Sequence, residues 1–414
     1  MNLAALKRFK QVEHFGLYAL VFVLPIMESP KHFALGIFFL GTLGRRLLER
    51  PISWRRPDFL EWLLLAIWAV ALASTVDNWP FPNGIKGLKN TSCMLFLFWA
   101  MYHGSYDIRQ LKRFLWALIA GVVVGLIWGL CEWQSGIRIQ FEFHSAGIVT
   151  QSAIYLGIAI LVMVGMVLDN TSGFSSKPRI FTGVCLAFSL VCLILMGSRG
   201  AILGVLVALC LMIPIFCRLY RSRVILIFAA AIAIAGIAVI VSVPSKKVMS
   251  RVSHIVSNFS LNPNTSNQND MFRVDHWIVG YAQATQGGHM LLGIGPKNFT
   301  SVKVDRLALS RPLATYPRIW TIPEHAHNLF LTIWVEEGLL GLIAFVLFLG
   351  AVAWNLIASR PRRDGISWPW VAALGALVIP VVAGSFNSSF ENEFAWLAMM
   401  LMGLGMSKAR KEVG

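Results

Sequence analysis

The chain has 414 residues, of which 57% are hydrophobic, and its mean hydropathy is +0.66. Uncharged apolar runs such as Val224 to Val243 extend for 20 residues, which excludes a soluble enzyme and indicates a polytopic membrane protein. The formal net charge is +16, but the cations lie in separate short clusters. This distribution excludes nucleic acid as a partner and fits membrane lipids with anionic headgroups.

The apolar runs predict an all-α protein, because lipid offers no partner to backbone amides and the runs lack the alternation of barrel strands. Read in chain order, they predict about twelve transmembrane helices and one large loop that contains short helices. The predicted spans are 14–29, 32–44, 58–76, 86–103, 114–132, 148–168, 180–197, 201–217, 224–243, 328–357, 369–386 and 393–406. The chain thus divides into nine spans (1–243), the loop (244–327), and three spans with a tail (328–414).

Lysine and arginine are distributed unevenly among the short segments that flank the predicted spans. These segments alternate between the two sides of the membrane and so form two sets. One set holds 22 of the 36 cations, including the residues before the first span and after the last. The alternate short flanks hold only Lys31, Lys86, Lys89, Arg138 and Arg199. Because cationic flanks resist translocation, both termini are expected to be cytoplasmic and the large loop to face outward.

The outward loop holds most of the side chains that are able to do chemistry. Met271 to Gln286 has helical spacing, with Asp275 and His276 on one face and Arg273 and Trp277 on the next, and we interpret it as a short helix at the membrane surface. Leu291 to Pro296 is expected to form a tight apolar turn whose glycines let the backbone pass close to a lipid-linked substrate or a neighbouring helix.

The outward loop carries nine cations and four acids, so its net charge is positive. The cations are Lys246, Lys247, Arg251, Arg273, Lys297, Lys303, Arg306, Arg311 and Arg318. A cationic lobe beside a bilayer suits a polyanionic substrate such as a lipid pyrophosphate; the alternative for each of these residues is a solvated surface. The chain has no DxD motif, and none of the six cysteines falls in the loop, so we expect no metal site there and guanidinium groups to balance the phosphate charge.

Two arginines are the candidates for binding phosphate. Arg199 lies in a very short outward turn between the seventh and eighth spans, where it breaks the positive-inside trend. The alternative to phosphate binding is that Arg199 is an interfacial arginine whose guanidinium group lies among the lipid headgroups. Arg273 has the alternative of pairing with Asp270 or Asp275 on its own helix.

His325 and His327 precede the tenth span, at the outer membrane face. On a helix, residues two apart point to different faces, which argues against a shared zinc ion. A histidine that opens a span beneath a cationic loop suits a general base, because its unperturbed pKa lies near neutrality.

Glu336-Glu337-Gly338 interrupts the same apolar run. The interruption indicates that 328–335 is a surface-lying or half-inserted piece and that the true span is 339–357. Glu337 is a candidate to orient a histidine or contact a sugar, and the interpretation as a hydrated helix break is favoured over both roles.

In four stretches, the chain resembles the O-antigen ligases of the Gram-negative inner membrane, within a superfamily that also contains O-antigen polymerases and protein O-oligosaccharyltransferases. The resemblance covers about 180–350. The stretches, in order, are Gly197-Ser198-Arg199-Gly200-Ala201; Arg273 with Trp277; Gly293-Ile294-Gly295-Pro296 followed by Phe299; and His327-Asn328-Leu329-Phe330-Leu331 leading to Glu337-Gly338.

Such ligases transfer a completed polysaccharide from undecaprenyl pyrophosphate to a sugar hydroxyl of the lipid A-core, without metal or nucleotide, at the periplasmic face. The resemblance implies that His327 is the essential histidine and that Arg199 and Arg273 are the essential arginines, which bind the pyrophosphate. His325, Arg318, Trp277 and Glu337 are further candidates for substrate binding. His325 is an extra histidine beside the motif, so it is the alternative base.

Two other functions compete with the ligase. A polymerase of O-antigen or exopolysaccharide would use the same donor with a second lipid-linked glycan as acceptor, and the sequence separates the two enzymes poorly. A small-anion transporter would also place arginines in a helical bundle, but the nearly charge-free spans and the absence of internal repeats argue against one. A protein O-oligosaccharyltransferase is disfavoured because its members usually carry an added external domain.

Overall fold

The protein is a bundle of α-helices, and the described residues contain no β-strand. The computed structural model describes residues 3–49, 57–80, 83–219, 268–286, 288–310, 313, 325–361, 365–387 and 390–412. The helices are α1 (Leu3–Val23), α2 (Glu28–Leu48), α3 (Phe59–Asp77), α4 (Gly84–Tyr102), α5 (Ile108–Gln134), α6 (Val149–Leu168), α7 (Ser176–Met196), α8 (Arg199–Leu219), α11 (Gln268–Gln286), α12 (Leu329–Ala358), α13 (Trp368–Asn387) and α14 (Asn392–Glu412), with 3₁₀ turns η2 (Phe299–Ser301) and η3 (Val304–Arg306).

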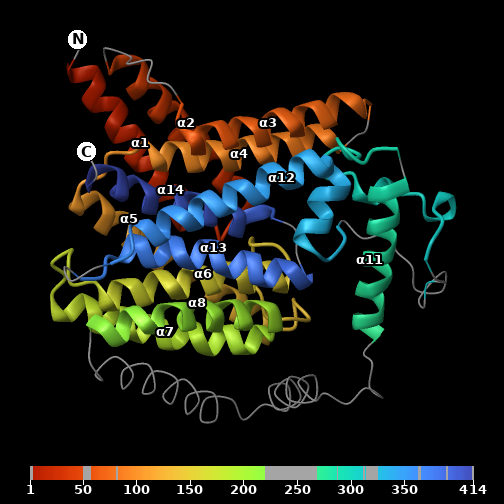
Figure 1. Cartoon of the computed structure of the whole chain (residues 1–414). Coiled ribbons are helices and arrows are strands. Elements are labelled where there is room, and N and C mark those ends of the chain that lie inside the picture. The colour runs from red at the N-terminus through yellow and green to blue at the C-terminus, as the bar shows by residue number, and fades with distance from the viewer. Residues whose placement is uncertain are drawn as a thin grey trace.

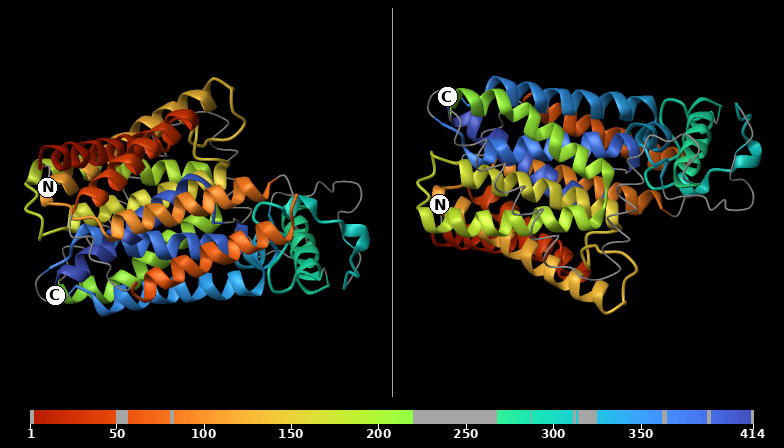
Figure 2. Two further views of the ribbon diagram at one scale, coloured as in Figure 1. Left: turned by 90° about the horizontal axis from the view of Figure 1, so that it is seen from above. Right: turned by 90° about the horizontal axis from the view of Figure 1, so that it is seen from below.

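The long helices run along one axis, and α11 lies across one end of the bundle (Figure 1). Both termini lie at the opposite end, and the views from above and below agree on this arrangement (Figure 2). Within the described part of the chain, six helices are long and apolar enough to cross a membrane: α3, α5, α6, α7, α12 and α13. The chain is therefore a polytopic membrane protein, and the helix predicted at 271–286 is present as the crosswise α11.

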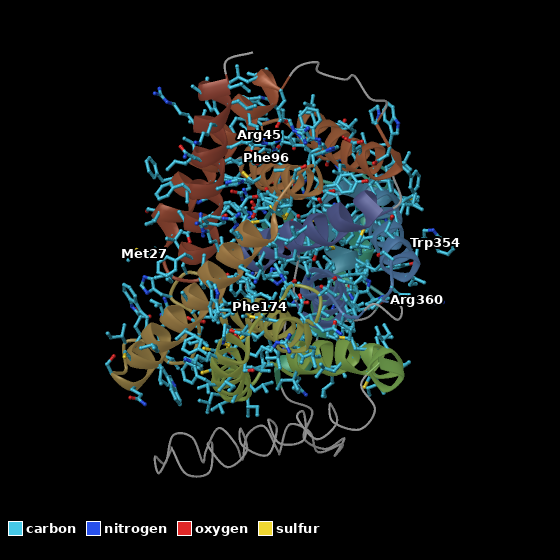
Figure 3. The ribbon with its side chains drawn as sticks, turned by 90° about the vertical axis from the view of Figure 1, so that its left-hand side faces the viewer. Met27, Arg45, Phe96, Phe174, Trp354 and Arg360 are labelled. Carbon is cyan, nitrogen blue, oxygen red and sulfur yellow. The ribbon has the colours of Figure 1, made fainter. Side chains whose placement is uncertain are left out.

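Helix α6 occupies the centre of the bundle, where it packs against α7, α8, α13 and α14, and nearly all of its residues are buried. The outer helices instead leave large apolar side chains exposed, such as Phe33 and Ile180. Trp354 near the end of α12 is 71% exposed and projects from the edge of the bundle (Figure 3). So much exposed apolar surface is costly in water and is typical of a surface that faces lipid.

Eleven of the twelve predicted spans fall on helices, and the ninth, 224–243, lies outside the described residues. The first prediction, 14–29, was wrong at both ends. Helix α1 begins at Leu3, and it ends at Val23 because Pro25 has no amide hydrogen to continue the ladder and restricts the residue before it. The predicted break in the tenth span is confirmed, since Gly338 has non-helical backbone angles inside α12.

Buried ion pairs hold the ends of several helices together. At the α11 end, the Lys31 ammonium binds the Glu393 carboxylate at the start of α14, and it also binds Glu28 at 2.5 Å. At the end with the termini, Arg45 of α2 binds Glu13 of α1 at 2.5 Å. Because both partners in each interhelical pair are buried, removal of one partner leaves a charge in a low-dielectric setting.

We expect Lys31→Met to lower the free energy of unfolding by about 3–5 kcal/mol, because Glu393 then stays buried without its cation. Thermal unfolding in detergent micelles measures the change. Lys10→Met is the matched control, because Lys10 pairs with Glu49 at 3.6 Å across a partly exposed surface, where a pair contributes less than about 1 kcal/mol. The double variant Lys31→Met with Glu393→Leu is expected to recover most of the loss; a loss equal to that of Lys31→Met would show that the charge of Glu393 is not the cause.

Candidate functional site

A break in α12 organises the end of the bundle at which α11 lies. At the break, the carbonyls of Val335 and Glu336 accept hydrogen bonds from the amides of Ile294 and Gly295, at 2.9 and 2.8 Å. The amides of Leu339 and Leu340 donate in return to the carbonyls of Met290 and Leu291, at 2.9 and 3.2 Å. The turn expected at 291–296 therefore exists, and the neighbour that it approaches is this helix.

Glycine is required on both sides of this contact. Gly293 and Gly338 both have a φ of +71°, in the left-handed region that residues with a Cβ avoid. A Cβ on Gly338 would lie 2.1 Å from the Leu291 carbonyl oxygen, and one on Gly293 would lie 2.4 Å from the Glu336 backbone. The two backbones can form the ladder only because neither residue carries a side chain.

Polar side chains of α3 and of α12 itself fix the turn further. The Ser74 hydroxyl donates to the Glu336 carbonyl at 2.9 Å, and the Asn78 amide donates to the Gly293 carbonyl at 3.0 Å. The Glu336 carboxylate accepts from the Phe299 amide at 3.3 Å. Glu336, which the sequence pattern had placed only in a helix break, is thus a structural acceptor for the outer turn.

Helix α11 and the turn share a small hydrophobic core of their own. Its buried members include Val279 and Ala284 of α11, Ile294 of the turn, Phe299 of η2, and Val335 of α12. The helix face that carries Asp275, His276 and Val279 is buried, while Tyr281 on the neighbouring face is exposed. This core fixes α11 against the first turns of α12.

Hydrogen bonds fix the positions of the residues just before α12. The Asn328 side chain caps the helix by accepting from the Leu331 amide at 2.9 Å, and it donates to the Ser385 carbonyl of α13 at 2.8 Å. The Thr332 hydroxyl donates to the Asn328 carbonyl at 2.7 Å and accepts from the Ala326 amide at 3.1 Å. His327, between these anchors, has a φ of +51°, a strained angle that surrounding contacts must maintain.

Three histidines meet at this point. The ring centroids of His325 and His327 are 4.8 Å apart, and those of His327 and His276 are 5.2 Å apart. The expectation that His325 and His327 point to different faces was wrong, because α12 begins only at Leu329 and the two residues are not helical. His276 was named in the sequence only as part of a helix face; its position on the buried face, one residue before Trp277, was the available signal.

Arg199 is brought toward His327 by the end of α13. Gly197, in a left-handed conformation, ends α7, and Arg199 is the first residue of α8. The next residue, Gly200, lies against Ala383, since a Cβ on this glycine would be 3.3 Å from the Ala383 Cα. Asn328, which follows His327, binds Ser385. The neighbours of Arg199 and of His327 therefore contact the same three-residue stretch of α13.

Arg273 and Trp277 lie one turn apart on α11, as their spacing predicted. The Trp277 indole N–H donates to the His327 carbonyl at 3.3 Å, so α11 binds the histidine segment directly. Arg273 is half-buried one turn earlier. The start of α8, the start of α12 and the middle of α11 thus gather Arg199, His327 and Arg273 at one end of the bundle.

Two further candidates are placed differently. Glu337 lines a pocket behind the α12 break, together with Asn90 of α4 and the ion pair of Lys297 with Glu391 at 3.1 Å. Arg318 lies outside the described residues, as do residues 244–267 of the outward loop. Within the described ranges, no three His, Cys, Asp or Glu side chains are arranged to hold a metal ion.

The fold and this site define a polytopic membrane protein with histidine and arginine side chains gathered at one end of its bundle. A protein-family model described as O-antigen ligase matches residues 184–346. That range contains Arg199, the α12 break and the three histidines. This match supports membership of the O-antigen ligase superfamily for the part of the chain that it covers. A search of curated proteins finds no match to the chain.

We expect Gly338→Ala to destabilise the protein, because the added methyl group collides with the Leu291 carbonyl and the Gly338 backbone angles, φ +71° and ψ −175°, cost a residue with a Cβ about 1–3 kcal/mol. Gly350→Ala is the matched control on the same helix, since a Cβ there meets no atom within 4 Å. Thermal unfolding in micelles should show a lower midpoint for Gly338→Ala than for wild type and no loss for Gly350→Ala. Equal midpoints for the two variants would contradict the close contact at the break.

Proposed function

We propose that this protein is an O-antigen ligase: a membrane glycosyltransferase that moves a polysaccharide from undecaprenyl pyrophosphate to a sugar hydroxyl of the lipid A-core. The observation that carries the proposal is the gathering of Arg199, Arg273 and His327 around the starts of α8 and α12 and the middle of α11. The match to the O-antigen ligase family over 184–346 supports the same reaction. In this proposal the site faces the periplasm of a bacterial inner membrane, and both termini are cytoplasmic.

The arginines act on the leaving group. A lipid pyrophosphate departs readily, and the negative charge that grows on its bridging oxygen needs stabilisation more than protonation. Two guanidinium groups supply this stabilisation in forked hydrogen bonds. Arg199 acts from the first turn of α8, where the backbone N–H groups of a helix start and the helix dipole also favour an anion.

His327 acts on the acceptor. A sugar hydroxyl is a weak nucleophile, so the base removes its proton as the oxygen attacks the anomeric carbon from the face opposite to the pyrophosphate. This single displacement inverts the anomeric configuration. His327 suits the role better than His325, because His325 is only 7% exposed while His327 is half-buried and more accessible to a substrate.

The membrane itself contributes to the reaction. Donor and acceptor both carry lipid tails, so a bilayer confines them to one plane and raises their effective concentration. A site at the end of a bundle, rather than at its centre, suits reacting groups that stand at the headgroup level. The crosswise α11 and the turn that follows it cover this end of the bundle (Figures 1 and 2).

The test is reconstitution of the purified protein in vesicles with lipid-linked polysaccharide and lipid A-core, without added metal. We expect Arg199→Ala, Arg273→Ala and His327→Ala each to lower transfer at least about 100-fold, as removal of a group that stabilises charge or moves a proton does. His325→Ala is expected to be milder. Gel electrophoresis of the lipid A product measures the transfer.

Monodisperse elution from a size-exclusion column, with unchanged thermal unfolding, controls for loss of fold in each variant. Transfer by His327→Ala at the wild-type rate would remove the proposed base. If glycan chains lengthen on the lipid carrier instead of appearing on lipid A, the enzyme is a polymerase. Uptake of inorganic phosphate by the vesicles, with no glycan transfer, would identify a transporter.

A further inference from the structure

His276 of α11 is fully buried and packs its ring against that of His327. Burial of a polar ring is costly unless the ring makes polar contacts, and the neighbouring Asp275 is also fully buried. The next residue, Trp277, binds the His327 backbone carbonyl. Two consecutive residues of α11 thus contact His327: His276 packs against its ring, and Trp277 binds its backbone carbonyl.

Close approach of the backbones makes this contact possible. Gly280, one turn after His276, lies against Ala326 and Leu331, with a Cβ position 3.4 and 3.1 Å from their side chains. Val279 and Ala326 belong to the same buried cluster. The packing of α11 on the start of α12 therefore holds the backbone segments that carry His276 and His327 close together.

We propose that His276 is a positioning residue for His327, which it orients and stabilises in the protonated state. This inference rests on the proposed function of His327 as the base. At a centroid separation of 5.2 Å, rotation of the rings brings a nitrogen of each within hydrogen-bond distance, and such contacts tighten when substrate binds. Neutral His276 then accepts a hydrogen bond from one ring N–H of His327, so that the second ring nitrogen of His327 acts as the base.

The acceptor O–H bond breaks, and its proton moves to the second ring nitrogen of His327. The acceptor oxygen forms a bond to the anomeric carbon, while the bond from that carbon to the phosphate oxygen breaks and its electron pair leaves with the pyrophosphate. His276 keeps its own protons and stabilises the imidazolium through the hydrogen bond. His327 returns its extra proton to water after the products leave.

A packing role and a positioning role give opposite orders for two variants. His276→Phe keeps an aromatic ring but removes both nitrogens, whereas His276→Gln keeps a hydrogen-bond acceptor but loses the ring. If His276 only fills space, His276→Phe is the more active of the two. If it positions His327, His276→Gln is the more active, and kcat falls while KM for donor and acceptor stays the same.

The experiment measures kcat and both KM values in the reconstituted transfer assay. We expect His276→Phe to lower kcat about 10–100-fold, the usual effect of removing a group that orients a functional side chain, and His276→Gln to recover part of that loss. His276→Gly, assayed with added imidazole, should regain activity, while His276→Phe should not because its ring fills the space. His289→Phe is the control, since His289 lies in the same outer lobe but 3.9 Å from Asp77 and apart from the histidine cluster.

Each outcome has a distinct meaning. Wild-type kcat in His276→Phe, or greater activity in His276→Phe than in His276→Gln, overturns the positioning role and leaves the ligase proposal intact. If His276→Gly fails to fold, the order of the Phe and Gln variants decides. If the wild-type protein transfers no glycan, the proposed function fails, and the role of His276 fails with it.

Discussion

Four backbone hydrogen bonds between the outer turn and the broken helix α12 determine the shape of the whole site. A helix interrupted inside a membrane leaves amides and carbonyls without partners, and lipid cannot supply them. The turn at 290–295 supplies these partners, so the break and the turn have to occur together. The same turn leads from α11, and its fixed position therefore decides where α11 lies on the start of α12.

The chemistry of the site follows from this arrangement. His327 directly precedes the Asn328 helix cap, and its own carbonyl accepts a hydrogen bond from the Trp277 indole, so its backbone is fixed before any substrate binds. Catalysis at a weak nucleophile depends on such prior order, because a base that must first be oriented loses the advantage of proximity. Rigid elements around a left-handed His327 are thus consistent with its proposed role, and α13 links them to the helix that begins at Arg199.

Several cations in the flanks predicted to face outward form ion pairs within the protein. Lys31 and Arg138, which break the positive-inside trend, bind the carboxylates Glu393 and Glu132, and Lys297 binds Glu391. A buried pair of this kind is stabilising only when its geometry is close. The structure therefore gives these three cations carboxylate partners within the protein, which the charge pattern of the sequence could not do.

The lengths of the hydrophobic runs and their interruptions by proline or glycine were enough to determine the all-helical class and most helix positions. They also determined the break at Glu336-Glu337-Gly338 and the turn at 291–296. These features depend on neighbouring residues and on the lack of hydrogen-bond partners in lipid. Local pattern could not determine which helices pack together. Only the tertiary structure brought His276 to His327, corrected the expected divergence of His325 and His327, and joined the starts of α8 and α12 through α13. The bonds from α11 to His327 and from Asn328 to α13 link residues 50 and 57 positions apart, and their geometry depends on side-chain packing across several helices at once.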